Sequence, residues 1–173
     1  MSRRFQFDFD KALEAILYIA KRIPDPTFHK ISKIFYLADL AHLEKYGRFI
    51  AGDRYIAMEY GPVPSETNNI MRAARGEDQQ RANKEIIENA FEVEGNHKVK
   101  PLREARPSVF SRSDLECLDV SITTYGRKSF GYLTDKTHDA AWKATADGQE
   151  MRLEVIISMF KDAEALREHL EIG

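Results

Sequence analysis

The stretch that decides the fold runs from Phe28 to Ser65 and reads FHKISKIFYLADLAHLEKYGRFIAGDRYIAMEYGPVPS. Its first half predicts a helix over Phe28–Tyr46 that starts after the capping residue Thr27 and stops at Gly47. Apolar residues fall on two sides of this helix, so we expect other elements to pack on both sides and bury it at the centre of the fold. The two stripes are Ile31, Ile34, Phe35, Ala38 and Ala41, and Tyr36, Leu37, Leu40 and Leu43.

The second half predicts a strand over residues 54–60 (RYIAMEY), because its side chains alternate between two faces. One face is fully apolar (Ile56, Met58, Tyr60) and the other is mixed (Tyr55, Ala57, Glu59). The next residues, Gly61-Pro62-Val63-Pro64-Ser65, predict a rigid turn, because each proline fixes its own φ and restricts the residue before it. We expect Ser65 to cap the following helix.

Outside this stretch the pattern is again mainly helical. A first helix, capped by Asp8 or Asp10, has an apolar stripe on one face only, so we expect it to lie on the core and not inside it. Other expected features are a polar loop at 77–84, a β-hairpin around Gly95, a helix capped at Ser111 or Ser113, a short helix that starts at Ser129 and a helix from Asp162. We therefore predict a mainly helical α+β fold with a buried central helix and a small antiparallel sheet or hairpin. We expect one domain over residues 1–173, with a core at 9–142 and a C-terminal helical segment at 151–171.

Composition excludes several classes of protein. The chain has 173 residues, 43% hydrophobic and 31% charged, with a net charge of -2, which is typical of a soluble globular protein and provides no basic field for nucleic acid. The single cysteine, Cys117, rules out an internal disulfide framework. No apolar run reaches the roughly 20 residues of a membrane span, and the start has no secretory h-region. We expect a cytoplasmic protein without a membrane partner.

Candidate catalytic residues are few. None of the five histidines forms a tight metal-binding motif. Asp39 and His42 lie one helical turn apart and could join His138 in a metal-dependent hydrolase, if the three side chains converge within about 5 Å. The alternative is that Asp39 and His42 bind neighbouring backbone, such as the turn near Gly61, as buried polar groups must. We predict no catalytic residue, no metal and no cofactor, and a structural role for Cys117.

Basic residues occur in several places but are interleaved with Asp and Glu, which favours a mixed-charge solvated surface over a nucleic-acid interface. These residues are Lys30, Lys33, Arg72, Arg75, Arg103, Arg106, Arg112, Arg127 and Lys128.

The run K-I-F-Y-L-A-D-x-x-H-L-x-K-Y-G-R-x-I-x-G-D-x-Y-x-A-x-x-Y-G-P-V-P-S resembles the signature of the Panacea (SocA-like) antitoxin domain family. The second half resembles the family too, in Phe110-Ser111-x-x-Asp114, in Tyr125-Gly126, and from Ser129 to Trp142. The chain departs from the pattern at Phe49 and at Asn68-Asn69, which bears on partner identity more than on fold. The matching motif residues that we expect to have a structural or binding role are Asp39, His42, Tyr46, Gly47, Asp53, Gly61, Pro62 and Pro64.

The resemblance implies an antitoxin of a toxin–antitoxin system, of a kind frequent in phages and prophages, without enzymatic activity. Such a protein binds a toxin protein encoded by the adjacent gene and neutralises it by covering its active surface. Alternatives are an adaptor that delivers the toxin to a protease and a DNA-binding autoregulator of the operon; a homo-oligomer is also open. Nucleic acid is the less favoured partner on charge balance.

The rigid turn and the mixed face of the preceding strand are the candidate partner-binding surface, because a preformed edge loses little entropy on binding. If the shared motif is only scaffold, the loop at 77–84 and the hairpin near Gly95 would bind the partner instead. The candidate partner-binding residues are Tyr55, Glu59, Tyr60, Val63 and Ser65.

Overall fold

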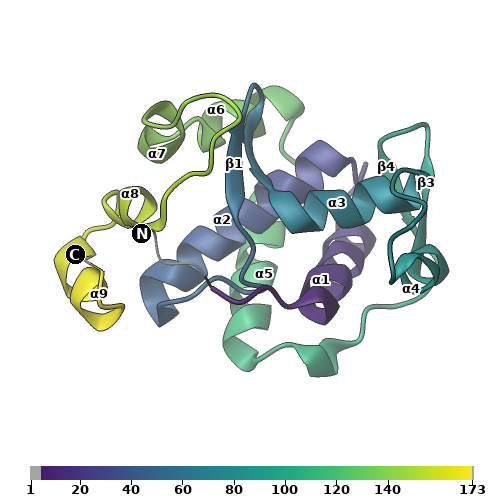
Figure 1. Cartoon of the computed structure of the whole chain (residues 1–173), viewed down its shortest axis with the longest axis horizontal. Helices are drawn as coiled ribbons and strands as arrows, with labels where there is room; N and C mark the ends of the chain where they lie inside the picture. The colour runs from purple at the N-terminus through teal and green to yellow at the C-terminus, as the bar shows by residue number, and fades with distance from the viewer. Residues whose placement is uncertain (1–4, 173) are drawn as a thin grey trace.

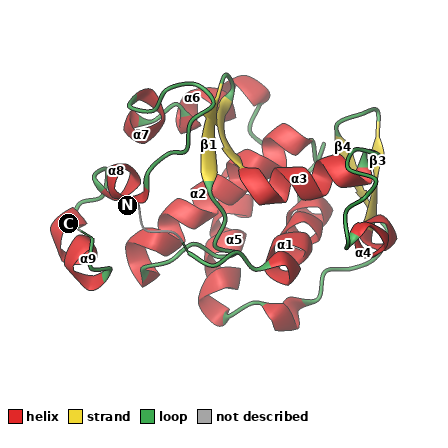
Figure 2. Cartoon of the chain, viewed as in Figure 1, coloured by secondary structure: helices red, strands yellow, loops and turns green. Residues whose placement is uncertain are grey.

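The structure, a computed structural model, describes residues 5–172 and is arranged around one long central helix (Figure 1). Figure 2 shows a mainly helical molecule with two short strand pairs in separate places, which confirms the expected α+β class. In chain order the elements are α1 (Phe9–Arg22), α2 (Phe28–Tyr46), β1 (Tyr55–Met58), β2 (Gly61–Pro64), α3 (Ser65–Ala74), α4 (Lys84–Ala90), β3 (Phe91–Glu94), β4 (Lys98–Pro101), η1 (Pro107–Val109), α5 (Arg112–Tyr125), α6 (Phe130–Thr137), α7 (Ala140–Lys143), α8 (Leu153–Ile157) and α9 (Ala163–His169).

The central helix α2 begins and ends where the sequence predicts. The Thr27 hydroxyl oxygen accepts a hydrogen bond from the Lys30 amide, and Gly47 ends the helix with a left-handed φ of 79°. Helices α1, α3, α5 and α6 and strand β2 all contact α2. Neither apolar stripe is fully covered: Leu37 and Leu40 of the second are only half-buried, and Ala41 of the first is exposed.

Helix α1 lies inside the fold and not on its surface, so that expectation was wrong. Its N-cap is Asp8, and every residue from Ala12 to Ala20 is buried. The polar side of the helix is covered by the chain that follows β4: Arg103 forms a two-pronged ion pair with Glu14 at 2.8 Å, and the Arg106 amide donates to the same carboxylate. Burial is possible because this partner neutralises Glu14, which the stripe alone could not reveal.

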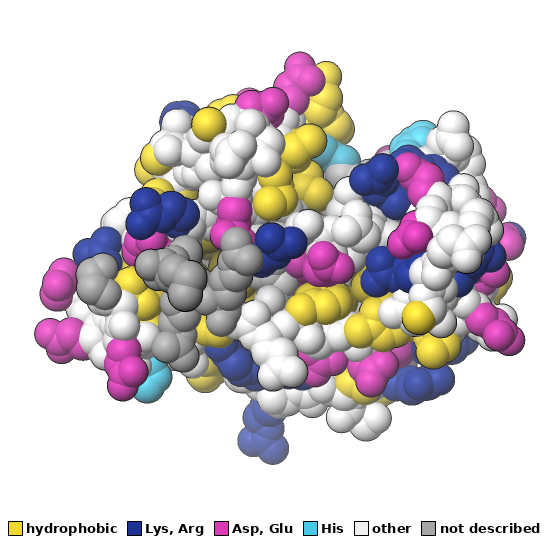
Figure 3. All heavy atoms as spheres, in the orientation of Figure 1, with side chains coloured by type: hydrophobic (Ala, Val, Ile, Leu, Met, Phe, Trp, Pro, Cys, Tyr) yellow, Lys and Arg dark blue, Asp and Glu magenta, His cyan; other side chains and the backbone are white. Residues whose placement is uncertain are grey.

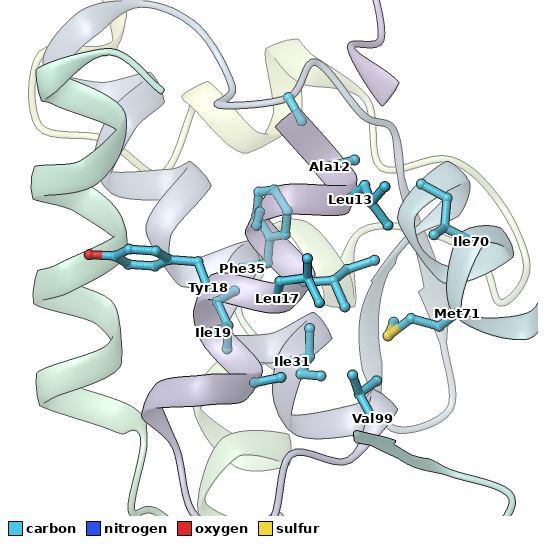
Figure 4. Close-up of a cluster of buried hydrophobic side chains, with 14 of the residues drawn as sticks. Ala12, Leu13, Leu17, Tyr18, Ile19, Ile31, Phe35, Ile70, Met71 and Val99 are labelled. Carbon is cyan, nitrogen blue, oxygen red and sulfur yellow. The ribbon is translucent and has the colours of Figure 1, made fainter. Parts of the chain in front are cut away.

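The larger of two apolar cores lies between α1, α2 and α3 (Figure 4). Figure 4 shows Leu13 and Leu17 of α1 facing Ile70 and Met71 of α3, with Val99 of β4 below them. A second core lies on the other side of α2 and includes β1 and the C-terminal helices. The arrangement confirms that α2 is central, because it contributes to both cores.

The two faces of β1 are used differently from the expectation. Tyr55 and Ala57, on the mixed face, are buried in the second core. Met58 and Tyr60, on the apolar face, are exposed. The reason lies in tertiary contacts. The backbone of residues 148–151 forms hydrogen bonds with the edge of β1 that faces away from β2, and the Tyr55 hydroxyl donates to the buried Asp39 carboxylate.

Residues 61–64 form a strand, which corrects the predicted turn. β2 pairs antiparallel with β1, with Met58 opposite Gly61, so the turn of this β1–β2 hairpin is Glu59-Tyr60. Strand β2 has no further strand partner in the described chain. Proline is tolerated at such an edge, where its missing N–H also prevents pairing with another chain.

Helix α3 begins at Ser65, but Ser65 does not cap it. Its N-terminal amides are bound instead by Asp53, whose carboxylate accepts hydrogen bonds from the amides of Glu66 and Thr67 and from the Thr67 hydroxyl, at 2.7 to 3.0 Å. The cap therefore comes from a residue before β1, which ties the start of the hairpin to the helix that follows it.

The second half of the described chain follows its capping signals. The β3–β4 hairpin is confirmed, as are the N-caps Ser111 and Ser129. Ser111 forms a full capping box with Asp114. Helix α4 was not predicted, because its seven residues directly follow the most polar run of the chain.

Candidate functional site

An open groove of about 450 Å³ lies between the N-terminal half of α2, the β1–β2 hairpin and the first turns of α3. Figure 3 shows hydrophobic side chains gathered beside a hollow in this part of the surface. We call it the hairpin groove. Its lining residues are Phe28, His29, Ser32, Lys33, Ile56, Met58, Glu59, Tyr60, Gly61, Val63, Ser65, Asn68, Asn69 and Arg72.

The structure brings four of the five candidate binding residues to this groove. Glu59, Tyr60, Val63 and Ser65 line it, and Tyr60 is 52% exposed. Tyr55 lies elsewhere: it is 1% exposed and points into the second core. In this conformation Tyr55 has almost no side-chain surface for a partner, because the neighbouring strand backbone fixes which face of β1 is inside.

Aromatic side chains from α6 and α7 extend the groove's rim. The ring of Phe130, which is 51% exposed, lies 5.4 Å from the ring of Tyr60 and stacks at 4.0 Å on His29. The indole N–H of Trp142 donates a hydrogen bond of 2.8 Å to the Met58 carbonyl. Sequence reasoning missed Phe130, because no local signal connects it with a hairpin 70 residues earlier.

Lys33 lies at the inner side of the groove and is almost fully buried. Its Nζ donates a hydrogen bond of 2.8 Å to the Pro62 carbonyl, which holds β2 against α2. Burial lowers the pKa of Lys33 to about 7. Gly61 makes this approach possible: a Cβ there would lie 2.8 Å from Cε of Lys33 and 2.7 Å from the Thr137 hydroxyl oxygen.

His29, one turn before Lys33, is a neutral imidazole in this environment. Burial, and then the charge of Lys33, lower the pKa of His29 to about 4, although the Tyr60 backbone opposes the shift. Its Nε2 lies 3.1 Å from the Thr134 hydroxyl oxygen. Its Nδ1 is buried and makes no hydrogen bond of normal geometry with the described residues.

Asp39 connects α2 with the segment that leads into β1. One carboxylate oxygen accepts the Ile50 amide at 2.7 Å and the other accepts the Tyr55 hydroxyl at 2.6 Å. Burial raises the pKa of Asp39 to about 7, against the effect of these two donors. Asp39 binds backbone, as one of our two alternatives expected, but at Ile50 and not near Gly61.

His42 connects the loop after α2 with α5. Its Nδ1 donates to the Arg48 carbonyl at 2.8 Å, and Nε2 lies 2.9 Å from the Ser113 hydroxyl. Burial lowers the pKa of His42, so the neutral ring accepts the hydroxyl proton at Nε2. Asp114 lies beside it, 3.3 Å from Nε2, and forms ion pairs with Lys11 and Arg48.

The remaining motif residues also act on the scaffold. The Tyr46 hydroxyl donates to Glu116 of α5 at 2.8 Å. Gly47 supplies a left-handed stop, and Pro62 and Pro64 lie in the edge strand. Most of the motif therefore holds the hairpin and α5 to the central helix, while the groove is lined both by motif residues such as Tyr60 and Val63 and by residues between the motif positions such as Met58 and Glu59.

A model of a protein family, described as the SocA-like antitoxin, Panacea domain, matches residues 31–143. The chain belongs to that family. The match runs from the first turn of α2 to the end of α7, so it includes nearly all of the groove and its aromatic rim. Membership of an antitoxin family implies a toxin partner in general. A search of curated proteins and of solved structures gave no match to the chain.

The three residues of the hydrolase alternative do not form a metal centre in this Panacea domain. Across residues 5–172, no group of three or more His, Cys, Asp and Glu side chains is placed to hold a metal ion. Asp39 and His42 have separate partners, and His138 stacks on Trp142 at 3.6 Å. Cys117 is buried, and burial raises the pKa of its thiol, which makes the thiolate form harder to reach.

Several of the basic residues that we considered for nucleic acid are paired with acids. Arg72 and Arg75 both bind Glu77, and Arg103 binds Glu14. These pairs place an acidic side chain beside each of these three basic residues. The described helices include none with the length and apolar character needed to cross a bilayer.

Proposed function

We propose that this chain is an antitoxin that neutralises a cognate toxin by binding it directly and covering the toxin's active surface. The hairpin groove and its aromatic rim are the docking surface. The observation that carries the proposal is an open groove with exposed Tyr60 and Phe130 beside it, in a domain of an antitoxin family. Large exposed aromatic side chains around a concave site are typical anchors of protein interfaces.

The hairpin is suited to this role because its scaffold is fixed from inside. Asp39 holds Tyr55, Lys33 holds the Pro62 carbonyl, and Asp53 caps the helix that follows. A surface held in place before binding loses little conformational entropy on association. A stable complex would bury about 1,600 Å², so the toxin would extend beyond the groove over α6 and α3.

The first experiment is co-purification with the product of the adjacent open reading frame, tagged on that product. We expect a stable complex, and growth that is restored when both proteins are expressed. A complex without rescue would favour the adaptor role, in which a protease removes the toxin. If no complex forms and growth is not restored, direct neutralisation of that product is contradicted. That result would favour a regulator of the operon.

A second experiment places the interface. Glu59 is exposed at the tip of the hairpin, and no ion pair joins it to residues 5–172. Glu59→Arg should leave folding intact and change the affinity for the toxin, because it reverses the charge at the groove's edge. The matched control is Glu85→Arg on α4, an exposed position that does not line the groove. If both variants neutralise the toxin equally well, the hairpin tip is not part of the interface.

A further inference from the structure

Lys33 is a buried cation without a carboxylate partner. An ammonium group has three donors, and the single hydrogen bond that Lys33 makes within the described chain is to the Pro62 carbonyl. Lys33 is only 1% exposed, so water cannot compensate its charge, and none of the ion pairs among residues 5–172 includes it. A buried charge in this state is costly unless an opposite charge reaches it.

The other charged groups of the hairpin groove leave it short of negative charge. His29 and Arg72 line it together with Lys33, and Glu59 is the one acidic residue in the lining. Arg72 is already bound to Glu77, at 2.9 and 3.1 Å. Glu59 lies at the hairpin turn and is not within ion-pair distance of Lys33. The inner part of the groove therefore has a cation with unused donors.

The walls near this cation are apolar. Met58 and Tyr60 are exposed at the groove, and Val63 and Phe28 complete its apolar side. A site with a cation at its inner side and apolar walls matches an acidic side chain that is carried next to a hydrophobic one.

We propose that the hairpin groove binds an acidic side chain of the partner toxin through Lys33, with an adjoining hydrophobic side chain packed on Met58, Tyr60 and Val63. The proposal deepens the proposed function and rests on it for the identity of the partner. It makes Lys33 a specificity residue in addition to a support of β2. The carboxylate accepts hydrogen bonds from the ammonium donors that the Pro62 carbonyl leaves unused, and it supplies the missing counter-charge.

The test uses two blocked dipeptides that differ only in charge, acetyl-Phe-Glu-amide and acetyl-Phe-Gln-amide, added to the full chain and followed by amide NMR shifts. We expect the Glu peptide to shift the signals of Tyr60 and Gly61 and to bind at least fivefold more tightly than the Gln peptide. Lys33→Met should abolish that preference. The control, Lys161→Met in the exposed segment between α8 and α9, should preserve it.

A pH series tests the same point without a variant, in case Lys33→Met does not fold. The charged or titratable groups beside Lys33 in the groove are His29 of α2, Glu59 and Tyr60 of the hairpin and Arg72 of α3. Of these only an imidazole ordinarily titrates between pH 6 and 9, and burial has already lowered the pKa of His29 to about 4. The preference for the Glu peptide should therefore fall as pH rises from 6 to 9 and Lys33 loses its proton.

Equal binding of the two peptides, a preference that survives in Lys33→Met, or a preference that does not depend on pH would overturn the proposal. With the adjacent-gene product as the probe, Lys33→Met should bind at least tenfold more weakly, and Lys161→Met should bind as the parent does. If that product does not bind the parent chain, the proposed function fails for it, while the peptide preference still decides the chemistry of the groove.

Discussion

The Tyr55 hydroxyl lies 2.6 Å from the Asp39 carboxylate, inside the fold and closed to solvent. This contact joins the first strand of the hairpin to the central helix. It also determines which side of the hairpin faces out, because side chains alternate along a strand. With Tyr55 inside, the side chains of Ile56 and Met58 must face the hairpin groove.

Tyr55→Phe should destabilise the protein by about 1–3 kcal/mol, because it leaves a buried Asp39 oxygen without its donor. Urea unfolding followed by circular dichroism measures the change. Tyr60→Phe is the matched control and should have the stability of the parent, since the Tyr60 side chain is exposed. Equal stability of the Tyr55 and Tyr60 variants would contradict the role given to the Asp39 contact.

Gly61→Ala should destabilise the protein by about 2–5 kcal/mol, since strain and overpacking add at this position. Gly61 has a φ of +117°, and a Cβ would clash with Thr137 and Lys33. Gly95→Ala is the control: its φ is +57° and nothing lies within 4 Å of the added atom, so about 1 kcal/mol is expected. A smaller loss at Gly61 than at Gly95 in thermal unfolding would show that β2 can move away from Lys33.

Asp53→Ala should cost about 1–3 kcal/mol, because it removes the acceptor for the first amides of α3. Ser65→Ala should have little effect on stability, since the Ser65 side chain does not cap the helix. Denaturant midpoints of the two variants give the comparison. A larger loss of stability for Ser65→Ala than for Asp53→Ala would show that Ser65 caps α3, as the sequence pattern indicates.

The stability difference between the parent chain and Lys33→Met should depend on pH. Lys33 has a pKa of about 7 in the folded chain and near 10.5 when unfolded, so the unfolded chain binds more protons between these values. Stability of the parent therefore rises with pH in this window, relative to Lys33→Met, with a limiting slope of about 1.4 kcal/mol per pH unit. Urea unfolding of both proteins at pH 7, 8 and 9 measures the slope, and a constant difference would contradict the lowered pKa of Lys33 in the folded chain.

Tyr60→Ala should weaken toxin binding by about 2 kcal/mol, roughly thirtyfold, without loss of stability, because Tyr60 is an exposed aromatic at the groove. Ile86→Ala on α4 is the control, since Ile86 is equally exposed but does not line the groove. Titration calorimetry with the purified toxin gives both affinities. A larger loss for Ile86 would move the interface to the α4 end of the molecule.

Local signals in the sequence were sufficient where the physics is local. The central helix begins after Thr27 and ends at Gly47, and two later helices begin after Ser111 and Ser129. These ends could be predicted because a cap acts within one turn of its own residue. The predicted helix over Phe28–Tyr46 agrees with the structure at both ends. Four of the candidate binding residues came together because they are close in the chain: Glu59, Tyr60 and Val63 lie in one hairpin, and Ser65 starts the helix that directly follows it.

The sequence failed where a distant residue supplies the deciding contact. The apolar pattern of α1 could not show that Arg103 forms an ion pair with Glu14 and covers it. The sequence pattern indicated Ser65 as the cap of α3, but the cap is Asp53, 12 positions before Ser65. Prolines at 62 and 64 predicted a turn, yet an edge strand needs no N–H at those positions.

By itself the sequence determined most of the helices, the family signature and the position of the β3–β4 hairpin, because periodicity, capping and motif spacing are written along the chain. The tertiary structure alone decided which face of β1 is buried and that Phe130 joins Tyr60 at the rim. It also decided that Lys33 is a buried cation without a carboxylate partner among the described residues. These properties depend on which segments pack together, and burial and pairing exist only once the chain has folded.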